Sequence, residues 1–400
     1  MIRKSFIYFP SFDAGTTGDS LRKKFKYPDG TSMRFIDKDY HPRYYCPYFL
    51  LTAGHCYKTP EYALKYDFEP EVKIMGDSGG YQLSTGQIKW EPGLKKIIFD
   101  WLETNSHIAM NLDIPPRNKF DGKFHECLTI SKDNFKFFAD NQSGKTDFLN
   151  VLQGININSY QNWYDEVKDF PFQGWAVGSA RTIPRMLAAL SVLVKNKEHL
   201  KPNNKWLHIL GISKVEDFLL LAQIQKSFDI VGSNITLTCD SSSPSRSVVY
   251  GYYYLGFDFK EMSFRMIQLP SRELIKEKKL NGYEYFTRAP VINDIDEIIW
   301  KNYTLDEYCQ WAPEHYASLA MRNFAVFLDC KKQSEEIINN GPEFINQIVS
   351  KDLAIVLNSI HEIITNPDQS LNIYSKYLPV YQKLSRVNSG TIGGENNDFF

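Results

Sequence analysis

The feature that most constrains the fold is an alternation, from residue 70 onward, of short β-rich runs with longer segments of helical periodicity. Strands are predicted at Val72–Gly76, His107–Leu112, Asp147–Leu152, Gly174–Gly178, Lys205–Leu210 and Asn234–Thr238. Between them, apolar residues at three- and four-residue spacing predict helices over Gly93–Thr104, Glu126–Asp140, Ser159–Phe170, Ile183–Lys197 and Lys214–Asp229. Repeated units of this kind indicate a parallel sheet covered by helices.

Polar residues gather where the apolar runs stop. They are Asp77, Asp113, Gln153, Gly178, Gly211 and Asp240. Because the carboxyl ends of parallel strands meet at one edge, we expect these residues to lie together where a (β/α)8 barrel builds its active site. A doubly wound open sheet gathers its ligands at the same edge. The number of successive units favours the α/β fold in its barrel form.

We expect three parts along the chain. Residues 1–70 are rich in Tyr, Phe and Pro without helical period, which predicts a small β-rich N-terminal lead-in packed on the barrel. Residues 71–340 are predicted to form the (β/α)8 barrel, and residues 341–400 a C-terminal helical extension with a flexible tail. A chain of 400 residues, 43% of them hydrophobic, can bury a core of this size.

Composition narrows the class of protein. A net charge of -1 gives no global attraction to nucleic acid, so such binding has to rest on local patches. The basic runs Arg22–Lys26 and Lys276–Lys279 are candidates, although each fits a solvated surface better. Six scattered cysteines without C-x-x-C spacing indicate reduced thiols. No apolar run approaches the roughly 20 residues of a membrane span, and we expect a cytoplasmic protein.

Two acids at different strand ends, Asp77 and Asp240, suit a nucleophile and a general acid/base acting on an anomeric carbon. Asp77 precedes Gly79 and Gly80, where missing side chains let a flat ligand approach the backbone. Tyr81 then offers a ring face on which a base can stack. The alternative is that Asp77 caps a helix and the glycines only turn the chain.

Asp113 and Gln153 suit the recognition of a purine edge. A carboxylate accepts hydrogen bonds from the ring N–H and the amino group of guanine, and an amide can both donate and accept. The alternative is turn stabilisation, since an acid before a proline-rich loop is common.

With these residues assembled, the chain resembles the tRNA-guanine transglycosylases. Gly76–Gln82 is similar to the family's D-S-G-G-[FY]-Q signature, and Asp240–Arg246 is similar to its nucleophile segment D-x-x-x-P-T-R. Between these two, in the family's order, lie counterparts of A-[LF]-D, Q-G-G, G-L-A-V-G and M-G-V, at Asn111–Asp113, Leu152–Gly154, Gly174–Gly178 and Leu210–Ile212. A weaker match is Arg322–Phe324, which resembles H-N-L.

The resemblance implies a pentosyltransferase that exchanges a base through a covalent intermediate. Asp240 would attack C1′ of a guanosine nucleotide, and Asp77 would move the proton. The remaining implied contacts are base reading by Asp113, Gln153 and the backbone N–H of Gly174, base packing by Tyr81 and Leu210, and a polynucleotide contact by Arg246. The incoming base would be a free 7-deazaguanine.

The chain also departs from the family. The family's structural zinc uses C-x-C-x-x-C and the His of H-N-L, but here Arg322 replaces that His and only Cys309 lies nearby. A guanidinium cannot ligate zinc, so we predict no cofactor, with the zinc absent or its module rebuilt. Residues 1–70 do not resemble the tRNA enzyme's lead-in, and Gln173 and Trp175 replace small or aliphatic residues beside the base site.

These departures favour the branch that inserts 7-deazaguanines such as preQ0 into DNA, which occurs in phages and bacterial genomic islands and protects DNA from restriction. DNA is then favoured over tRNA as partner, with a homodimer or helper proteins as further partners, in the host cytoplasm if a phage encodes the protein. One alternative is a zinc-free tRNA-guanine transglycosylase. Another is a non-catalytic partner subunit, against which the presence of both Asp77 and Asp240 argues. An ordinary barrel glycosidase has no use for Asp113 and Gln153.

Overall fold

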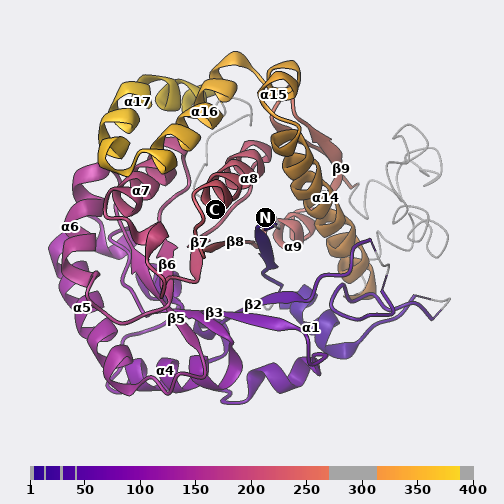
Figure 1. The fold of residues 1–400 in the computed structure, drawn as a ribbon. Coiled ribbons are helices and arrows are strands. Elements are labelled where there is room, and N and C mark those ends of the chain that lie inside the picture. The colour runs from indigo at the N-terminus through magenta and orange to yellow at the C-terminus, as the bar shows by residue number, and fades with distance from the viewer. Residues whose placement is uncertain (1–3, 13–14, 28–29, 41–42, 270–312, 388–400) are drawn as a thin grey trace.

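A computed structural model describes residues 4–12, 15–27, 30–40, 43–269 and 313–387 (Figure 1). Its main feature is one eight-stranded parallel sheet in the order β1-β8-β7-β6-β5-β4-β3-β2. An isolated parallel bridge between Ser11 and Leu50 joins the two ends of this order and closes the ring. The chain therefore forms the (β/α)8 barrel that its sequence predicts, and the open doubly wound alternative is excluded.

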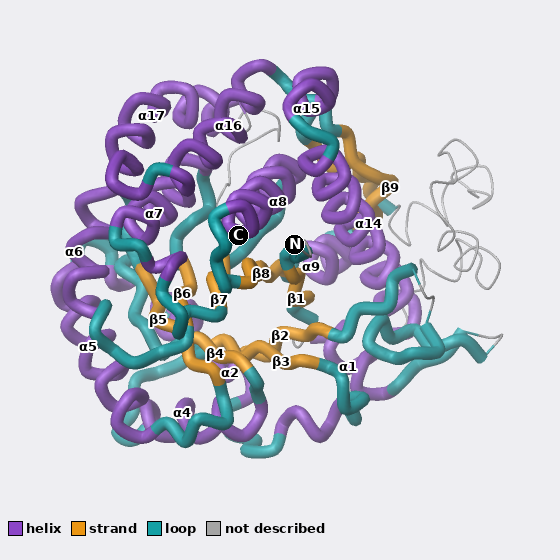
Figure 2. Tube along the Cα trace, in the orientation of Figure 1, coloured by secondary structure: helices purple, strands orange, loops and turns teal. Residues whose placement is uncertain are grey.

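The strands form an inner ring, and helices α4 to α7 lie outside it (Figure 2). The barrel strands are β1 (Ile7–Pro10), β2 (Tyr48–Thr52), β3 (Lys73–Asp77), β4 (Ile108–Met110), β5 (Asp147–Leu152), β6 (Gly174–Val177), β7 (Trp206–Ile209) and β8 (Thr236–Ser241). The helices among them are α1 (Gly15–Lys23), α2 (Ala53–Cys56), α3 (Gly80–Thr85), α4 (Leu94–Asn105), α5 (Phe124–Asn141), α6 (Ile157–Val167), α7 (Ile183–Lys195) and α8 (Val215–Ile230). Short 3-10 turns are η1 (Tyr62–Tyr66), η2 (Asn118–Phe120) and η3 (Glu198–Leu200).

Apolar side chains on both faces of the strands hold the barrel to its helices. In β5, the outward ring of Phe148 packs against Phe99 of α4 and Phe138 of α5, with centroid distances of 5.7 and 5.2 Å. Strands buried on both sides read as continuous apolar runs rather than as alternating ones. This is why the sequence predicts β3 to β8 as apolar runs.

The barrel begins earlier than the predicted boundary at residue 71. Strands β1 and β2 lie within the predicted lead-in, where β1 pairs with β8 and β2 pairs with β3. The segment between these two strands is rich in Tyr, Phe and Pro and shows no long helical period. The βα alternation is therefore hidden in this part of the sequence, and treating residues 1–70 as a separate lead-in was wrong.

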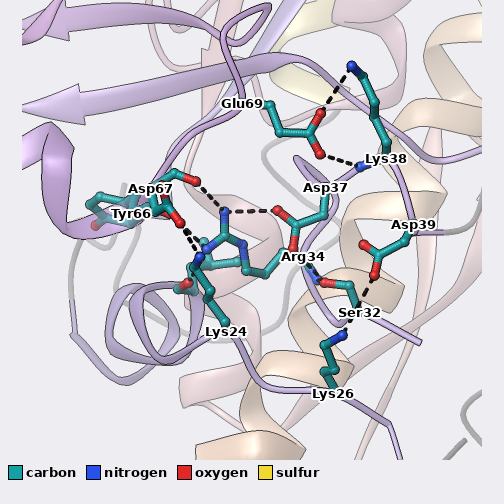
Figure 3. A network of polar contacts seen from close by, with 11 residues as sticks. Lys24, Lys26, Ser32, Arg34, Asp37, Lys38, Asp39, Tyr66, Asp67 and Glu69 are labelled. Atoms are coloured by element: carbon teal, nitrogen blue, oxygen red, sulfur yellow. Dashed lines mark hydrogen bonds and ion pairs between the residues drawn. The ribbon is translucent and has the colours of Figure 1, made fainter. Parts of the chain in front are cut away.

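Arg34 organises the segment between β1 and β2 (Figure 3). Its guanidinium is buried, donates hydrogen bonds to the carbonyl oxygens of Leu21 and Tyr66 at 3.2 and 2.8 Å, and pairs with Asp37 at 2.9 Å. A buried charge is tolerated when it is paired and hydrogen-bonded in this way. Arg34 thereby ties α1 to η1 and holds this long connection on the barrel.

The helices after the barrel form an outer layer. After α9 (Ser243–Val249) and the antiparallel hairpin of β9 (Tyr252–Asp258) and β10 (Ser263–Gln268), the described chain resumes in α14 (Pro313–Asn339). α14 packs between α1 and α8. The last helices are α15 (Pro342–Ile348), α16 (Lys351–Thr365) and α17 (Ser370–Val387), with the turn η4 (Pro367–Gln369) before α17.

The C-terminal helical extension is confirmed, since α16 packs on α8 and α17 packs on α7. Within this extension, α15 and α16 are separate helices. Ser350 begins the second helix, because its side chain accepts a hydrogen bond from the N–H of Leu353 at 3.3 Å. Within the described residues, every helix is too short or too polar to act as a membrane span.

Candidate functional site

A cavity of about 640 Å³ opens at the carboxyl edge of the barrel. It contains the predicted site residues Asp77, Tyr81, Asp113, Gln153, Leu210, Asp240 and Arg246 among those that line it. These residues come from β3, β8, the helices α3 and α9, and the loops after β4, β5 and β7. The closed ring of parallel strands brings them together, as expected for this edge of a barrel.

Gly174 does not reach the cavity. It is the first residue of β6, whereas the cavity is lined by Gly178, directly after the end of that strand. Four residue steps along an extended strand separate the two positions by about 13 Å. The prediction that the backbone N–H of Gly174 reads a base was therefore wrong in its placement, and the loop Gly178–Ala180 occupies that side of the cavity.

Asp240 is held by residues on β7 and in the loop that follows it. The N–H of Gly211 donates a hydrogen bond to Asp240 Oδ1 at 2.8 Å. His208 Nε2 lies 3.3 Å from the same oxygen, without the alignment of a hydrogen bond, and His208 Nδ1 lies 2.8 Å from Thr238 Oγ1. These contacts orient one carboxylate oxygen, while the side chain stays 15% exposed to the cavity. The position suits a nucleophile.

Asp77 is the last residue of β3 and is partly exposed in the same cavity. Its Oδ1 accepts a hydrogen bond of 3.4 Å from the N–H of Gly79, the residue before α3. This is the contact expected if Asp77 only capped the helix, but 3.4 Å is long for a hydrogen bond. Asp77 therefore combines a weak turn contact with a place beside the ligand space.

Asp113 and Gln153 form a buried pair. Gln153 Nε2 donates to Asp113 Oδ2 at 2.7 Å, and the hydroxyl of Ser179 donates to Gln153 Oε1 at 2.8 Å. The hydroxyl and the carboxylate together fix which end of the amide faces Asp113. Burial is the main cause that raises the pKa of Asp113 to about 6; the charge of Asp77 adds to the effect and the bond from Gln153 opposes it.

Two glycines make room for this pair. A Cβ on Gly80 would lie 2.4 Å from the carbonyl oxygen of Asp113, and a Cβ on Gly178 would lie 2.1 Å from Gln153 Nε2. Neither position could carry a side chain without displacing the pair. Gly80 thus serves packing against Asp113, which is a more specific role than the open access for a flat ligand that the sequence indicates.

Two arginines at the cavity were missed by the sequence analysis, which predicted only Arg246. Arg117 and Arg181 line the cavity, in the loops after β4 and β6. The guanidinium of Arg117 lies 4.8 Å from the ring centroid of Tyr81, so one face of this ring is already covered. Burial lowers the pKa of both arginines. Their positions just after apolar runs could have revealed them.

The family's zinc has no counterpart among the described residues. No group of three or more His, Cys, Asp or Glu side chains there could hold a metal ion, and Cys309 lies outside the described residues. Arg322 is fully buried in α14, where its Nε donates to the hydroxyl of Tyr253 at 3.1 Å and its Nη2 donates to the carbonyl of Leu255 at 3.3 Å. Arg322 thus braces β9 against α14.

Comparison with known proteins adds no template for this site. No protein-family model matches the chain, and no curated protein matches it significantly. The cavity contains two acids from β3 and β8, which stand three positions apart in the ring, together with a buried carboxylate–amide pair and several arginines.

Proposed function

We propose that the protein is a guanine transglycosylase that exchanges guanine in DNA for a 7-deazaguanine such as preQ0. The observation that carries the proposal is that Asp77 and Asp240 line the same cavity as the buried pair of Asp113 and Gln153. An enzyme that replaces a base needs a nucleophile and a general acid/base at the anomeric carbon, and side chains that recognise the base. The similarity of the motifs around these residues to the transglycosylase family supports the same assignment.

The buried pair suits guanine. Near neutral pH the carboxylate of Asp113 accepts hydrogen bonds, and its pKa of about 6 leaves it mostly ionised there. It can take the N1–H and the 2-amino group, while the second N–H of Gln153 Nε2 donates to O6. A 7-deazaguanine presents the same three groups on this edge. The pair therefore reads the leaving base and the entering base alike.

In the exchange, an oxygen of Asp240 attacks C1′ as the bond from C1′ to N9 breaks, and the electron pair of that bond goes to N9. Asp77 gives a proton to the departing guanine and later takes one from N9 of the entering base. That N9 then attacks C1′ and releases the carboxylate of Asp240. One base replaces another with no net gain or loss of protons, and the configuration at C1′ is retained.

The choice of DNA rests on the departures from the tRNA enzymes. In those enzymes a zinc-braced region holds the anticodon arm, and here the position of its His is the buried Arg322. An enzyme for DNA does not need that region. Modified guanines in DNA would then shield it from restriction nucleases. The target base has to leave its stack to enter such a cavity.

The test is incorporation of radiolabelled guanine. Purified protein is incubated with label and, separately, with duplex DNA, single-stranded DNA and guanine-containing tRNA, and the label in each polymer is counted. We expect label in DNA. Label in tRNA alone would return the protein to the tRNA-modifying enzymes, and no label in any polymer would contradict a transglycosylase that acts alone. The Asp240→Ala variant is the control for label that binds without chemistry.

A further inference from the structure

Three arginines, Arg117, Arg181 and Arg246, line one half of the cavity, and the charge of a fourth, Arg185, acts on Arg181. Arg117 follows β4, Arg181 follows β6, Arg185 lies in the first turn of α7, and Arg246 lies in α9 after β8. In the order of the ring, β4 and β8 stand four strands apart with β6 midway between them. The half formed by β1, β2 and β3 lines the cavity instead with Ser11, Thr52, His55, Asp77, Gln82 and Gln87 among its polar residues.

The arginines are close enough to repel one another. After burial, the charges of Arg117, Arg246 and Arg185 also lower the pKa of Arg181. Among the described residues, no carboxylate lies within ion-pair distance of Arg117, Arg181 or Arg185. Arg117 Nε is buried and has no hydrogen-bond partner in the described part of the chain. The charges of Asp113 and Asp77 favour the charged form of Arg117, but no carboxylate pairs with Arg181 or Arg185 in the described part of the chain, which leaves these two guanidiniums available to an anion.

We propose that these four arginines form a phosphate-binding track that holds the backbone of the substrate strand along the β4–β6–β8 half of the cavity mouth. A guanidinium suits this role because its planar fork binds two phosphate oxygens at once. At the start of α7, Pro184 has no N–H, but the N–H groups of Ile183 and Arg185 add favourable partial charge for an anion. The choice of a nucleic-acid strand as the anion rests on the proposed function.

The track also explains how a chain with a net charge of -1 can bind a polyanion. Its positive charge is local and lies next to the base-reading pair, so the strand is attracted where the chemistry takes place. Phosphates along the track would flank the nucleotide whose base enters the cavity. The base then reaches Asp113 while the backbone remains at the rim.

The first experiment measures the salt dependence of binding. Fluorescence anisotropy follows a labelled single-stranded oligodeoxynucleotide with one guanine, between about 50 and 200 mM salt. Each lost phosphate contact should reduce the magnitude of the negative slope of log K against log salt by about 0.7. The double variant Arg181→Gln/Arg185→Gln should therefore lower it by about 1.4. Lys195→Gln is the matched control, since Lys195 is an exposed cation in the last turn of the same helix.

The second experiment removes the charge from the strand instead. Methylphosphonates replace the phosphates that flank the guanine, which should weaken binding to the unmodified protein about tenfold or more. The double variant should lose little more on the same probe, because each change removes the same contact. Equal losses on both proteins would overturn the track, and so would an unchanged salt slope. Thermal unfolding of each variant checks that the fold is kept.

The two proposals can fail separately. If the unmodified protein exchanges labelled guanine, but the salt slope is the same in the double variant, the proposed function stands and the phosphate-binding track is wrong. If the salt slope depends on the arginines and on the phosphate charge, but no guanine is exchanged, the phosphate-binding track stands and the proposed transglycosylase activity is wrong.

Discussion

Two buried carboxylates at opposite ends of the barrel differ in how fully they are hydrogen-bonded. Glu198, in η3 before β7, accepts from Trp175 Nε1 at 3.0 Å, Lys201 Nζ at 2.6 Å, Asn204 Nδ2 at 2.7 Å and the hydroxyl of Tyr164. Asp113, at the carboxyl edge, accepts from Gln153, the only side chain among the described residues that donates to it. Both are almost inaccessible to solvent.

The difference separates a structural acid from one that is available to a ligand. The donors around Glu198 fill its oxygens and tie α6, β6 and η3 together, so that nothing remains for a substrate. Asp113 keeps acceptor capacity facing a cavity, and burial raises its pKa to about 6. A buried carboxylate that lacks hydrogen-bond donors destabilises the fold unless a ligand supplies them. In this site the base would supply them.

The largest expected effect at the carboxyl edge is the loss of the covalent intermediate in Asp240→Ala. The variant has no oxygen to attack C1′, so no adduct with DNA should survive on a denaturing gel. The isosteric Asp240→Asn is the matched control, which keeps the hydrogen bond from Gly211 but should also form no adduct. An adduct in either variant would move the nucleophile elsewhere.

At the amino end, Glu198→Ala should lower the free energy of unfolding by about 3 kcal/mol, because buried donors lose their acceptor. Denaturant unfolding measures this. The folded fraction should still form the adduct at the normal rate, and Glu198→Gln, which keeps one acceptor, should be less destabilised. If Glu198→Ala impaired chemistry but not stability, the distinction between the two ends would fail.

Asp77→Asn should slow base exchange by at least about 100-fold, the usual scale for losing a general acid/base. The amide keeps an oxygen for the N–H of Gly79, so the turn should persist. Rates of guanine incorporation measure the effect, and thermal unfolding checks the fold. Normal turnover would reduce Asp77 to a turn residue.

The acidic limb of the pH profile should come from Asp113. Protonation removes its ability to accept from guanine, so KM for guanine should rise about tenfold per pH unit below about 6. Asp113→Asn should bind guanine weakly at every pH and lose this dependence. Because its folded pKa lies above its ordinary value of 3.8, Asp113 also makes stability fall, not rise, as pH increases through this window.

The smallest effect is expected at Ser179, whose hydroxyl orients Gln153. Ser179→Ala should weaken guanine binding about fivefold, the usual worth of one hydrogen bond near 1 kcal/mol. Ser179→Gly removes the same bond but suits the φ of 61° at this position, so it should bind guanine equally weakly while unfolding at a higher temperature than the alanine variant. Unchanged guanine affinity in both variants would show that guanine binding does not need Ser179 to orient Gln153.

Much of the barrel and of its site could be predicted from the sequence, because period and position carry the information. Apolar runs predict β3 to β8, and the strand β5 begins and ends at the predicted residues. Residues directly after such runs, among them Asp113 and Gln153, fall at one edge of any parallel sheet. Their convergence on one cavity follows once the sheet closes.

Only the tertiary structure decided which residues meet across the chain. Strands β1 and β2 have no long helical period between them to mark a βα unit, and they become barrel strands because β8 and β3 offer unpaired edges to them. Gly174 lies on β6, whose carboxyl end faces the cavity, but it is the first residue of that strand. His208 beside Asp240 and Arg117 against Tyr81 depend on side-chain packing between separate elements, which no local pattern encodes. Local periodicity determines where an element lies, whereas contacts between elements depend on the closed ring.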